Sequence, residues 1–330
     1  MKKLTVAIPT FNGGQNLERA IKSCEKIQIL SDDYEILVID NCSTDDSISN
    51  VNKLKKEFRN LRLVENQNNV GRIQNWNVAI DNAQGKFLIF LFSNDIINEE
   101  NNIHECIRTL DNDESISIGF ASLLKKEIEQ SFLKKSFATD MIKCSSKCFT
   151  KECLNRGLLP FGPIQSIIYR VQDINKDHNR FYEEMPINAD EIFTYKESIK
   201  REKILFTPKP QITWDLTQGR FHGKMKIEDE FREHSETIKI ISEFLGIKVN
   251  FGLVATYRAI NLLKFTTSNL KSEGKKVATK HLLSKMKQSG IFFNTDKILF
   301  KTFLNKIKNS RKDADDILYG MIVSDCQKLD

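Results

Sequence analysis

The chain has 330 residues, of which 40% are hydrophobic and 28% are charged, and its formal net charge is +6. This length and composition are typical of a globular protein with one large domain or two of ordinary size. No stretch approaches the roughly 18 consecutive apolar residues that a membrane-spanning helix needs, so we expect no such helix.

The N-terminal residues, MKKLTVAIPTFN, are basic, but their apolar run covers only five residues before Pro9. That run is too short for a secretory signal peptide, so we expect a cytoplasmic chain. The seven cysteines are scattered, and only Cys144, Cys148 and Cys153 lie close together in sequence. Because no CxxC pair and no nearby histidine accompany them, a zinc site is not expected. We expect all thiols to be reduced.

Strand and helix patterns alternate through the first hundred residues. Short apolar runs predict four buried strands, at residues 4–11, 34–40, 60–66 and 86–92. Amphipathic patterns between them predict three helices, at residues 16–27, 43–58 and 71–83. Strands separated by helices of this length form βαβ units with a parallel sheet. Ligands of such sheets bind beyond the carboxyl ends of the strands.

Polar segments follow all four predicted strands, at residues 10–14, 40–46, 66–71 and 93–95. Polar loops and helix caps explain many of these residues, for example Asn16 and Asp46. Asp40 and Asp95 are different, because each lies at the end of a predicted core strand. A polar loop at that position would not need a carboxylate. Two such residues on neighbouring strands indicate a functional site at this edge of the sheet.

The second part of the chain has weaker patterns. A helix is predicted at 102–111 and a strand at 115–124, whereas residues 129–160 have no clean period. A strand at 164–170, a helix at 188–201 and an extended segment at 203–215 follow, and the pattern beyond 225 is helical. We expect one domain over 1–220, with halves at 1–100 and 101–220, and a basic, mainly helical region over 221–330.

Three segments in this order resemble glycosyltransferase family 2. They are VAIPTFNGGQNLERAIKS, YEILVIDNCSTDDS and NNVGRIQNWNVAIDNAQGKFLIFLFSND, with weaker support from GPIQSIIYR and NADEIFTYKES. The resemblance covers roughly residues 2–215. It implies an α/β GT-A fold, a Rossmann-like and mainly parallel sheet flanked by helices, here with a helical C-terminal extension. It also implies transfer of a sugar from a nucleotide diphosphate, most often with inversion and a divalent metal.

The resemblance assigns the nucleotide to the ends of the first three strands. The first strand end would offer main-chain groups and an apolar wall to the base, through Pro9, Thr10, Phe11 and Asn12. Asp40 has the position of the family residue that accepts a hydrogen bond from the base imide N–H. The family's NxG…N segment is matched by Asn69, Gly71 and Asn77, although Gly71 alone also suits a helix-entry turn. Arg72 is a candidate phosphate contact.

Ser93, Asn94 and Asp95 occupy the position of the family's DxD motif, in which a carboxylate binds Mg²⁺ or Mn²⁺ at the diphosphate. Asp95 is the one charged residue of the three and is therefore the expected metal ligand, with Ser93 and Asn94 as nucleotide contacts. The neutral Asn94 predicts weak metal affinity, or coordination that relies on the phosphates themselves.

An inverting transfer needs a general base near the acceptor hydroxyl. The family position of that base is matched best by Asp190, with Glu191 as the second candidate, although acidic residues also favour a first helical turn through the helix dipole. The R-x-H of many relatives is missing, because Asp215 and Thr217 stand there, and His222 lies five residues further on. A catalytically weakened nucleotide-sugar-binding protein is therefore the alternative function.

The positive charge belongs to the C-terminal region, where residues 261–312 contain thirteen lysine and arginine residues against two acidic ones. Apolar residues are interleaved with these lysines, which suits either a solvated helical face or a peripheral contact with anionic lipid. No recognition motif indicates nucleic acid. The expected partners are a nucleotide sugar, with a lean toward UDP, and a glycan or lipid-linked acceptor of capsule or lipopolysaccharide type. A nucleotidyltransferase is disfavoured, because no Gly-rich basic loop follows the first strand.

Overall fold

The computed structural model describes residues 2–126, 131–134, 140–155, 161, 163–215, 227–246 and 326. The described strands are β1 (Lys2–Thr10), β2 (Tyr34–Asp40), β3 (Leu61–Glu65), β4 (Gly85–Phe90), β5 (Ile96–Ile97), β6 (Ile116–Lys126), β7 (Ser131–Lys134), β8 (Ile142–Ser145), β9 (Ile167–Arg170) and β10 (Lys203–Asp215). The described helices are α1 (Gly14–Ser23), α2 (Ser47–Leu54), α3 (Arg72–Asn82), α4 (Ile103–Asn112), α5 (Ser146–Asn155), α6 (Val171–Lys176), α7 (Ala189–Ser198) and α8 (Ile227–Leu245). Short 3₁₀ turns lie at Cys24–Lys26, Ser31–Asp33 and Ile164–Ser166.

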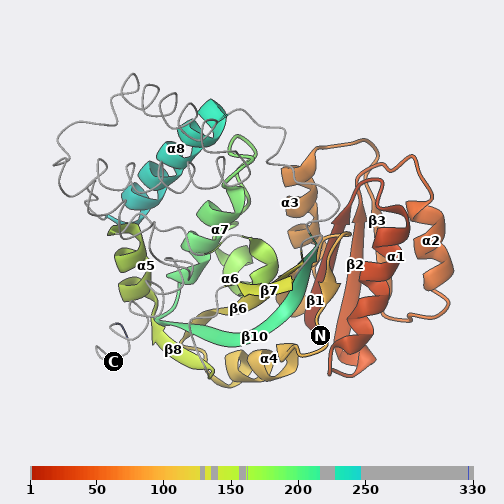
Figure 1. Cartoon of the computed structure of the whole chain (residues 1–330), viewed down its shortest axis with the longest axis horizontal. Coiled ribbons are helices and arrows are strands. Elements are labelled where there is room, and N and C mark those ends of the chain that lie inside the picture. The colour runs from red at the N-terminus through yellow and green to blue at the C-terminus, as the bar shows by residue number, and fades with distance from the viewer. Residues whose placement is uncertain are drawn as a thin grey trace.

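The strands form one sheet in the order β3-β2-β1-β4-β9-β6-β10-β5, with β7 beside β6 and β8 beside β10 (Figure 1). The four N-terminal strands pair in parallel, as their βαβ pattern predicts. Strand β9 is antiparallel to both β4 and β6 and joins this half to the C-terminal half. The sheet is therefore mixed, with parallel pairing among β1 to β4 and between β6 and β10, and the carboxyl ends of β1, β2, β3 and β4 lie at one edge.

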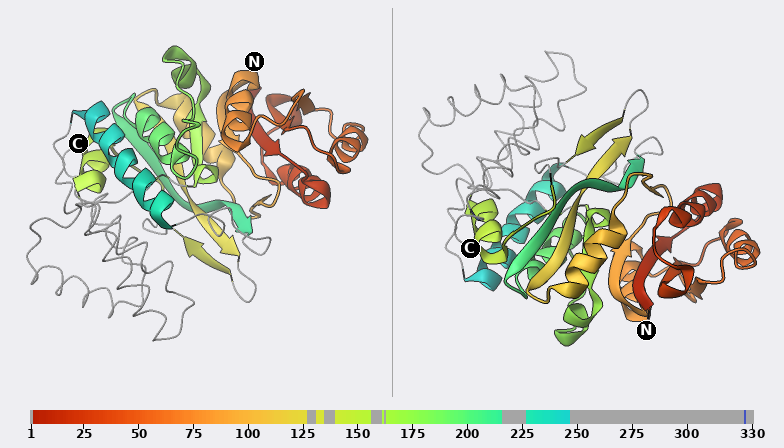
Figure 2. Two further views of the ribbon diagram at one scale, coloured as in Figure 1. Left: turned by 90° about the horizontal axis from the view of Figure 1, so that it is seen from above. Right: turned by 90° about the horizontal axis from the view of Figure 1, so that it is seen from below.

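The sheet buries an apolar cluster on each face, because side chains alternate along a strand. Val6 and Val38 belong to the cluster that packs against α1, α2 and α4. Ala7 and Ile39 belong to the cluster that packs against α3, α5 and α7. Figure 2 presents this layered arrangement from above and below. Helices on both faces explain why the strands read as continuous apolar runs rather than as alternating patterns.

The structure moves several predicted boundaries. The first helix begins at Gly14 with Gly13 as its N-cap residue, two residues before the predicted start. The second begins only at Ser47, whose N–H donates to Oδ1 of Asp45 at 3.0 Å in the preceding turn. Strand β4 ends at Phe90, two residues before the predicted end, and the chain then turns where the Asp95 N–H donates to the Phe92 carbonyl at 2.9 Å. Residues 129–160, which show no sequence period, contain β7, β8 and α5.

Helix α8 lies beyond the predicted domain boundary at residue 220, yet it packs against α7 (Figure 1). Its residues Ile238 and Ile241 join the apolar cluster of the α3, α5 and α7 face. The first of the predicted C-terminal helices therefore contributes to the core of the sheet domain. The basic region 261–312 lies outside the described residues, and its lipid contact stays a prediction.

Cys148 of α5 forms a disulfide with Cys326, 178 residues further along the chain. The prediction that all thiols are reduced is wrong for this pair. Sequence alone could not find it, because the two cysteines are brought together only by the packing of distant segments. The cysteines at 24, 42, 106, 144 and 153 are not disulfide-bonded. Within the described part of the chain, no helix is both long and apolar enough to cross a bilayer.

Candidate active site at the carboxyl edge of the sheet

Thr10 and Asp40 end the adjacent strands β1 and β2 and are register partners in the parallel ladder. Asp40 is 1% exposed, and its Oδ2 accepts the Ser43 N–H at 2.8 Å. Its Oδ1 and the Thr10 Oγ1 are buried, and neither has a hydrogen-bond partner among the described residues. A buried carboxylate oxygen without a donor is costly, and it is expected where a ligand supplies the missing donor.

The loops after β1 and β2 are bound to each other through Asn12. Its N–H donates to the Ser43 Oγ at 2.8 Å, and its Oδ1 accepts the Thr44 N–H at 2.8 Å. Asn12 has φ of 53°, a left-handed conformation that asparagine tolerates better than most residues. This turn leaves the neighbouring Phe11 49% exposed, although the residues of β1 from Leu4 to Thr10 are buried. An exposed aromatic residue directly after β1, the strand that pairs with β2, can form the apolar wall for a flat base.

The turn after β3 joins the same edge through Asn41, directly after β2. The Asn69 Oδ1 accepts the Asn41 Nδ2–H at 2.9 Å and the Gly71 N–H at 3.0 Å, and the Asn41 Oδ1 accepts the Val70 N–H at 2.9 Å. Gly71 has φ of 87°, which residues with a side chain rarely adopt, and α3 starts at the next residue. The structure thus brings the predicted residues Asn69 and Gly71 next to the ends of β1 and β2.

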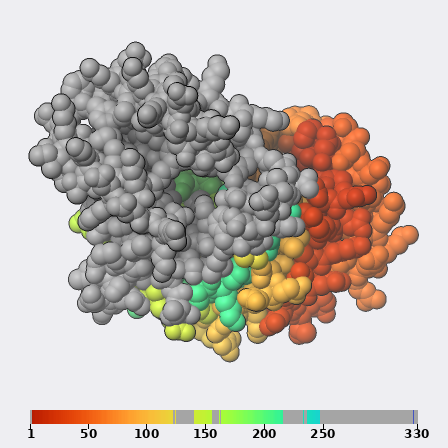
Figure 3. Space-filling view, viewed as in Figure 1, coloured from red at the N-terminus to blue at the C-terminus, as the bar shows by residue number. Residues whose placement is uncertain are grey.

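The loop after β4 closes against the β1 loop at Gly13. A Cβ at Gly13 would lie 2.5 Å from the Thr10 Oγ1 and 3.3 Å from the Ser93 Cβ, so only glycine fits there. The Asn94 Oδ1 accepts the Asn16 Nδ2–H at 3.4 Å, which ties the same loop to α1. Ser93 and Asn94 are therefore adjacent to the β1 loop and to α1. In the space-filling view, the first hundred residues make one continuous part of the surface (Figure 3).

Asp95 points into the protein and is 2% exposed. Its Oδ2 accepts the Gln165 Nε2–H at 2.8 Å, and its Oδ1 accepts the Asp215 N–H at 3.1 Å. Burial raises the pKa of the Asp95 carboxyl to about 7, and the charge of Asp215 acts in the same direction. The two hydrogen bonds and the charge of Arg19 lower that pKa but do not compensate for burial.

These contacts test the predicted metal ligand. Both oxygens of Asp95 already accept protein N–H groups, and Asp215, the neighbouring acid, lies 3.5 Å from the Arg19 guanidinium. The described residues contain no group of three or more His, Cys, Asp or Glu side chains that could hold a metal ion. In this arrangement they do not by themselves form a divalent-cation site, and the metal role of Asp95 stays a prediction. His222 lies outside the described residues.

Gln165 is a site residue that sequence reasoning missed. Its side chain is 1% exposed, its Nε2 binds Asp95, and its Oε1 has no hydrogen-bond partner within the described ranges. Together with Thr10 and Asp40, it is a third buried oxygen at this edge that lacks a donor. The available signal was one glutamine within the apolar run PIQSII, a pattern that a half-buried strand also produces.

The first turn of α7 contains Asp190 and Glu191, and the structure separates their surroundings. The Glu191 side chain is buried, and its Oε2 accepts the Phe161 N–H at 3.3 Å. Asp190 is only half-buried, and its Oδ1 accepts the Glu191 N–H at 3.0 Å. An acceptor hydroxyl can therefore approach Asp190 more easily than Glu191, which favours Asp190 as the base.

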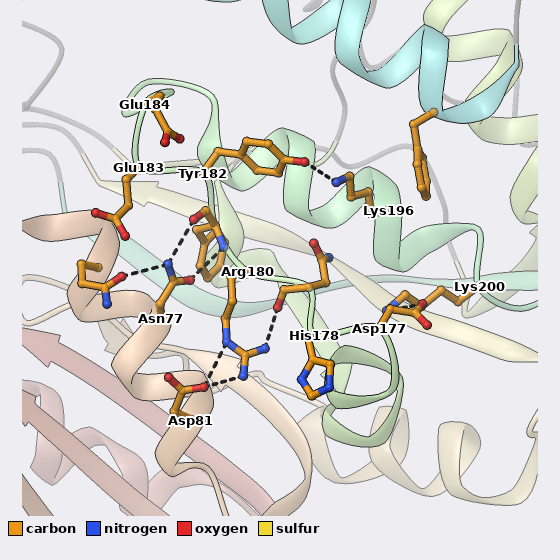
Figure 4. A pocket seen from close by; sticks show the side chains of 14 residues that line it. Asn77, Asp81, Asp177, His178, Arg180, Tyr182, Glu183, Glu184, Lys196 and Lys200 are labelled. Atoms are coloured by element: carbon orange, nitrogen blue, oxygen red, sulfur yellow. Dashed lines mark hydrogen bonds and ion pairs between the residues drawn. The ribbon is translucent and has the colours of Figure 1, made fainter.

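Arg72 and Asn77 of α3 contact the segment that precedes α7. The Arg72 guanidinium donates to the Pro186 carbonyl and lies 4.9 Å over the Trp76 ring. Burial lowers the pKa of this guanidinium, whereas the charges of Asp190 and Glu233 raise it. The Asn77 amide binds the Phe181 main chain at both ends, at 2.8 and 3.1 Å. Asn77 lines a pocket between α3 and α7, apart from the other predicted nucleotide contacts (Figure 4).

A sequence-family comparison agrees with this geometry. The model of the family described as "Glycosyl transferase family 2" matches residues 5–173, which include the ends of β1 to β4 and Gln165. This match covers half of the chain. The chain belongs to glycosyl transferase family 2.

Two curated relatives match parts of this family 2 chain. The poly(ribitol-phosphate) β-N-acetylglucosaminyltransferase TarS of Staphylococcus aureus is 26% identical over 207 residues, which are 62% of this chain and 34% of TarS. The GalNAc(5)-diNAcBac-PP-undecaprenol β-1,3-glucosyltransferase of Campylobacter jejuni is 41% identical over 96 residues, 29% of this chain and 30% of that enzyme. The chain spans about a third of the length of the curated relatives it matches.

Solved structures of similar shape confirm the predicted fold. A crystal structure of S. aureus TarS in complex with UDP-GlcNAc has a TM-score of 0.61 at 20% identity, covering 86% of this family 2 chain and 80% of the TarS chain. The mannosyltransferase PcManGT of Pyrobaculum calidifontis, in complex with GDP-Man and Mn²⁺, has a TM-score of 0.53 at 13% identity, covering 98% and 84%. The fold is GT-A, and a nucleotidyltransferase is no longer a candidate.

Proposed function

We propose that the protein transfers a sugar from a UDP-sugar to a glycan or lipid-linked acceptor, with inversion, in the synthesis of a bacterial surface polysaccharide. The observation that carries this proposal is the buried, donor-free Oδ1 of Asp40 beside the donor-free Oγ1 of Thr10. In a family 2 chain, these oxygens lie at the sheet edge where a nucleotide base is expected.

The chemistry of Asp40 supports a base that carries an imide N–H. Uracil donates through its N3–H, and the donor-free Oδ1 of Asp40 can accept that hydrogen bond. Cytosine has an acceptor at the same ring position, which would face a carboxylate oxygen without a proton. The exposed Phe11 ring can pack against the face of the base. The TarS structure with UDP-GlcNAc adds support for uridine over the other nucleotides.

Asp190 is proposed to act as the general base. The acceptor hydroxyl oxygen attacks the anomeric carbon on the side opposite the diphosphate, and the new glycosidic bond forms as the old carbon–oxygen bond breaks. The nucleotide diphosphate leaves with the bonding electron pair, and the hydroxyl proton passes to the Asp190 carboxylate. Attack from the opposite side inverts the configuration. No step of this scheme is assigned to a metal ion.

The relatives support the acceptor class. TarS is named for transfer to poly(ribitol-phosphate), and the C. jejuni enzyme is named for transfer to an undecaprenyl-linked saccharide. One named acceptor is a polyol-phosphate polymer, and the other is a lipid-linked saccharide. A peripheral contact of residues 261–312 with anionic lipid would bring the proposed site to such an acceptor. Capsule and lipopolysaccharide are the acceptor polymers that we propose for this chain.

A nucleotide-sugar-binding protein with lost catalysis is the second candidate. Asn94 favours it, because this residue brings no charge to the motif that usually binds the metal. So does the inward orientation of Asp95, whose oxygens both accept protein hydrogen bonds. The two candidates differ in turnover and not in donor binding.

Thermal-shift measurements with UDP-, GDP-, CMP- and dTDP-sugars test the donor first. We expect the largest stabilisation from a UDP-sugar, and its loss in Asp40→Ala. Asp46→Ala changes an exposed carboxylate six residues away and serves as the matched control. Release of UDP from the best donor in the presence of Mn²⁺ then separates the enzyme from the binding protein. Stabilisation by CMP-sugars alone would contradict the assignment of Asp40.

A further inference from the structure

The segment before α7 is bound to other elements at three places. The Asn77 amide of α3 pairs with the Phe181 main chain, and Arg72 of the same helix donates to the Pro186 carbonyl. The third contact comes from Glu233 of α8, whose Oε2 accepts the Ile187 N–H at 2.6 Å and the Asn188 N–H at 3.0 Å. The chain therefore enters α7 in a fixed position, two residues before Asp190.

Glu233 supplies hydrogen bonding that α7 does not provide for itself. Asn188 is the N-cap residue of α7, but its side chain makes no capping hydrogen bond. A carboxylate that accepts two main-chain N–H groups forms strong, charge-assisted bonds, and the N-terminus of a helix stabilises a negative charge. Helix α8 thus contributes the acceptor for the start of α7 from 45 residues further along the chain.

The burial of Glu233 indicates a specific role rather than a surface contact. The residue is 6% exposed, and a buried carboxylate is retained only where hydrogen bonds and an opposite charge offset its desolvation. The charges of Glu233 and Asp190 both act on the Arg72 guanidinium, so the three groups lie close enough to interact. Two helices, α3 and α8, thereby converge on the first turn of α7.

We infer that Glu233 is a positioning residue for Asp190, so that α8 completes the active site instead of being an appendage to it. This inference rests on the proposed function, in which Asp190 is the base. Helix α7 rises about 1.5 Å per residue, so Asp190 lies only about 3 Å along the helix from Asn188. A displacement of about 1 Å at the start of α7 would misalign the carboxylate with the acceptor hydroxyl.

The kinetic test compares Glu233→Ala, Glu233→Gln and the control Glu236→Ala, which changes an exposed residue on the same helix. We expect Glu233→Ala to lower kcat by about tenfold or more, while the Kd for UDP stays within about twofold. Glu233→Gln keeps an oxygen acceptor and is expected to recover part of the rate. Glu236→Ala should match the wild type in both quantities. An unchanged kcat, or an equal loss of UDP affinity, would overturn the inference.

A double variant tests whether Glu233 acts through Asp190. The combination of Asp190→Asn with Glu233→Ala is expected to be no slower than Asp190→Asn alone, within about twofold. If the losses in kcat of the two single variants multiply in the double variant, Glu233 acts independently of Asp190. Amide hydrogen exchange gives a readout that does not need turnover, because Glu233→Ala should speed exchange at Ile187 and Asn188 and Glu236→Ala should not. Unchanged exchange overturns the inference, whereas a wild-type protein that binds UDP without turnover overturns only the proposed function.

Discussion

The main-chain N–H of Asp215 donates to Oδ1 of Asp95 at 3.1 Å, which joins the end of β10 to the loop after β4. These residues are 120 positions apart in sequence. Through this hydrogen bond, the C-terminal half of the sheet covers the Asp95 carboxylate. Gln165 completes the enclosure from the 3₁₀ turn before β9, so both hydrogen bonds to Asp95 come from the second half of the domain.

The raised pKa of Asp95 predicts a pH-dependent gain in stability for Asp95→Asn. A pKa of about 7 in the folded state, above the ordinary 3.8, means that folding disfavours the charged form. Ionised Asp95 therefore costs stability progressively as pH rises from about 4 to 7, by a few kcal/mol in total. Asparagine removes this cost, and Gln165 can rotate its amide to accept from it.

Urea unfolding of Asp95→Asn and the wild type at pH 5 and pH 8 checks this prediction. We expect the difference in the free energy of unfolding to be larger at pH 8 and to stay constant above it. The exposed Asp46→Asn variant should show no such dependence. An equal difference at both pH values would mean that the Asp95 carboxyl titrates normally in the folded protein.

Asp190→Asn is expected to lower kcat by about a thousandfold or more, because the amide cannot take the hydroxyl proton. The Kd for UDP should stay near the wild-type value, since Asp190 is not among the predicted nucleotide contacts. Glu191→Gln is the matched variant and should retain most activity, because glutamine can still accept the Phe161 N–H. Steady-state kinetics and calorimetric titration with UDP measure both quantities. Near-normal turnover by Asp190→Asn would reject it as the base.

Asp40→Asn is expected to weaken UDP binding by about thirtyfold, since its amide N–H₂ would face the donor N–H of uracil. The Oδ1 of asparagine can still accept the Ser43 N–H, so the loop should keep its conformation. The same amide can donate to the ring acceptor of cytosine, and the preference for UDP over CDP should fall or reverse. Calorimetric titration with both nucleotides measures this change. A variant that binds UDP as the wild type does would place the base elsewhere.

The protein is expected to use a divalent metal that it binds with low affinity. Asn94 adds no charge, and the oxygens of Asp95 are already hydrogen-bonded, so the ion would rely on the substrate phosphates. Half-maximal rate should therefore need about millimolar Mn²⁺, measured by titration after removal of metal with EDTA. Full rate in excess EDTA would remove any metal role from Asp95, and micromolar dependence would require further ligands.

The disulfide between Cys148 and Cys326 predicts that five of the seven cysteines react with an alkylating reagent after denaturation without reductant. Seven should react after reduction, and mass spectrometry counts the labels. In Cys148→Ser all six remaining cysteines should be labelled without reductant. Seven labels on the unreduced wild-type protein would show that the pair is not oxidised.

Sequence patterns predicted the N-terminal half well, because each signal there is local. Apolar runs such as YEILVID specify buried strands, and their regular spacing with helices specifies parallel pairing. The place of Asp40 followed from this pattern, since the last residue of a strand must lie at the sheet edge. The structure adds that its Oδ1 lacks a donor and that its register partner is Thr10.

Only the tertiary structure decided which residues surround Asp95 and Asp190. Gln165 and Asp215 contact Asp95 across 70 and 120 residues. Glu233 contacts the start of α7 from a helix that was predicted to lie outside the domain. Such contacts leave no local period, because they depend on how whole elements pack rather than on the order of neighbouring residues. The sequence by itself therefore determined the fold, the family and the edge of the sheet that carries the site. Packing between distant segments decided that Asp95 faces inward and that Asp190 is less buried than Glu191.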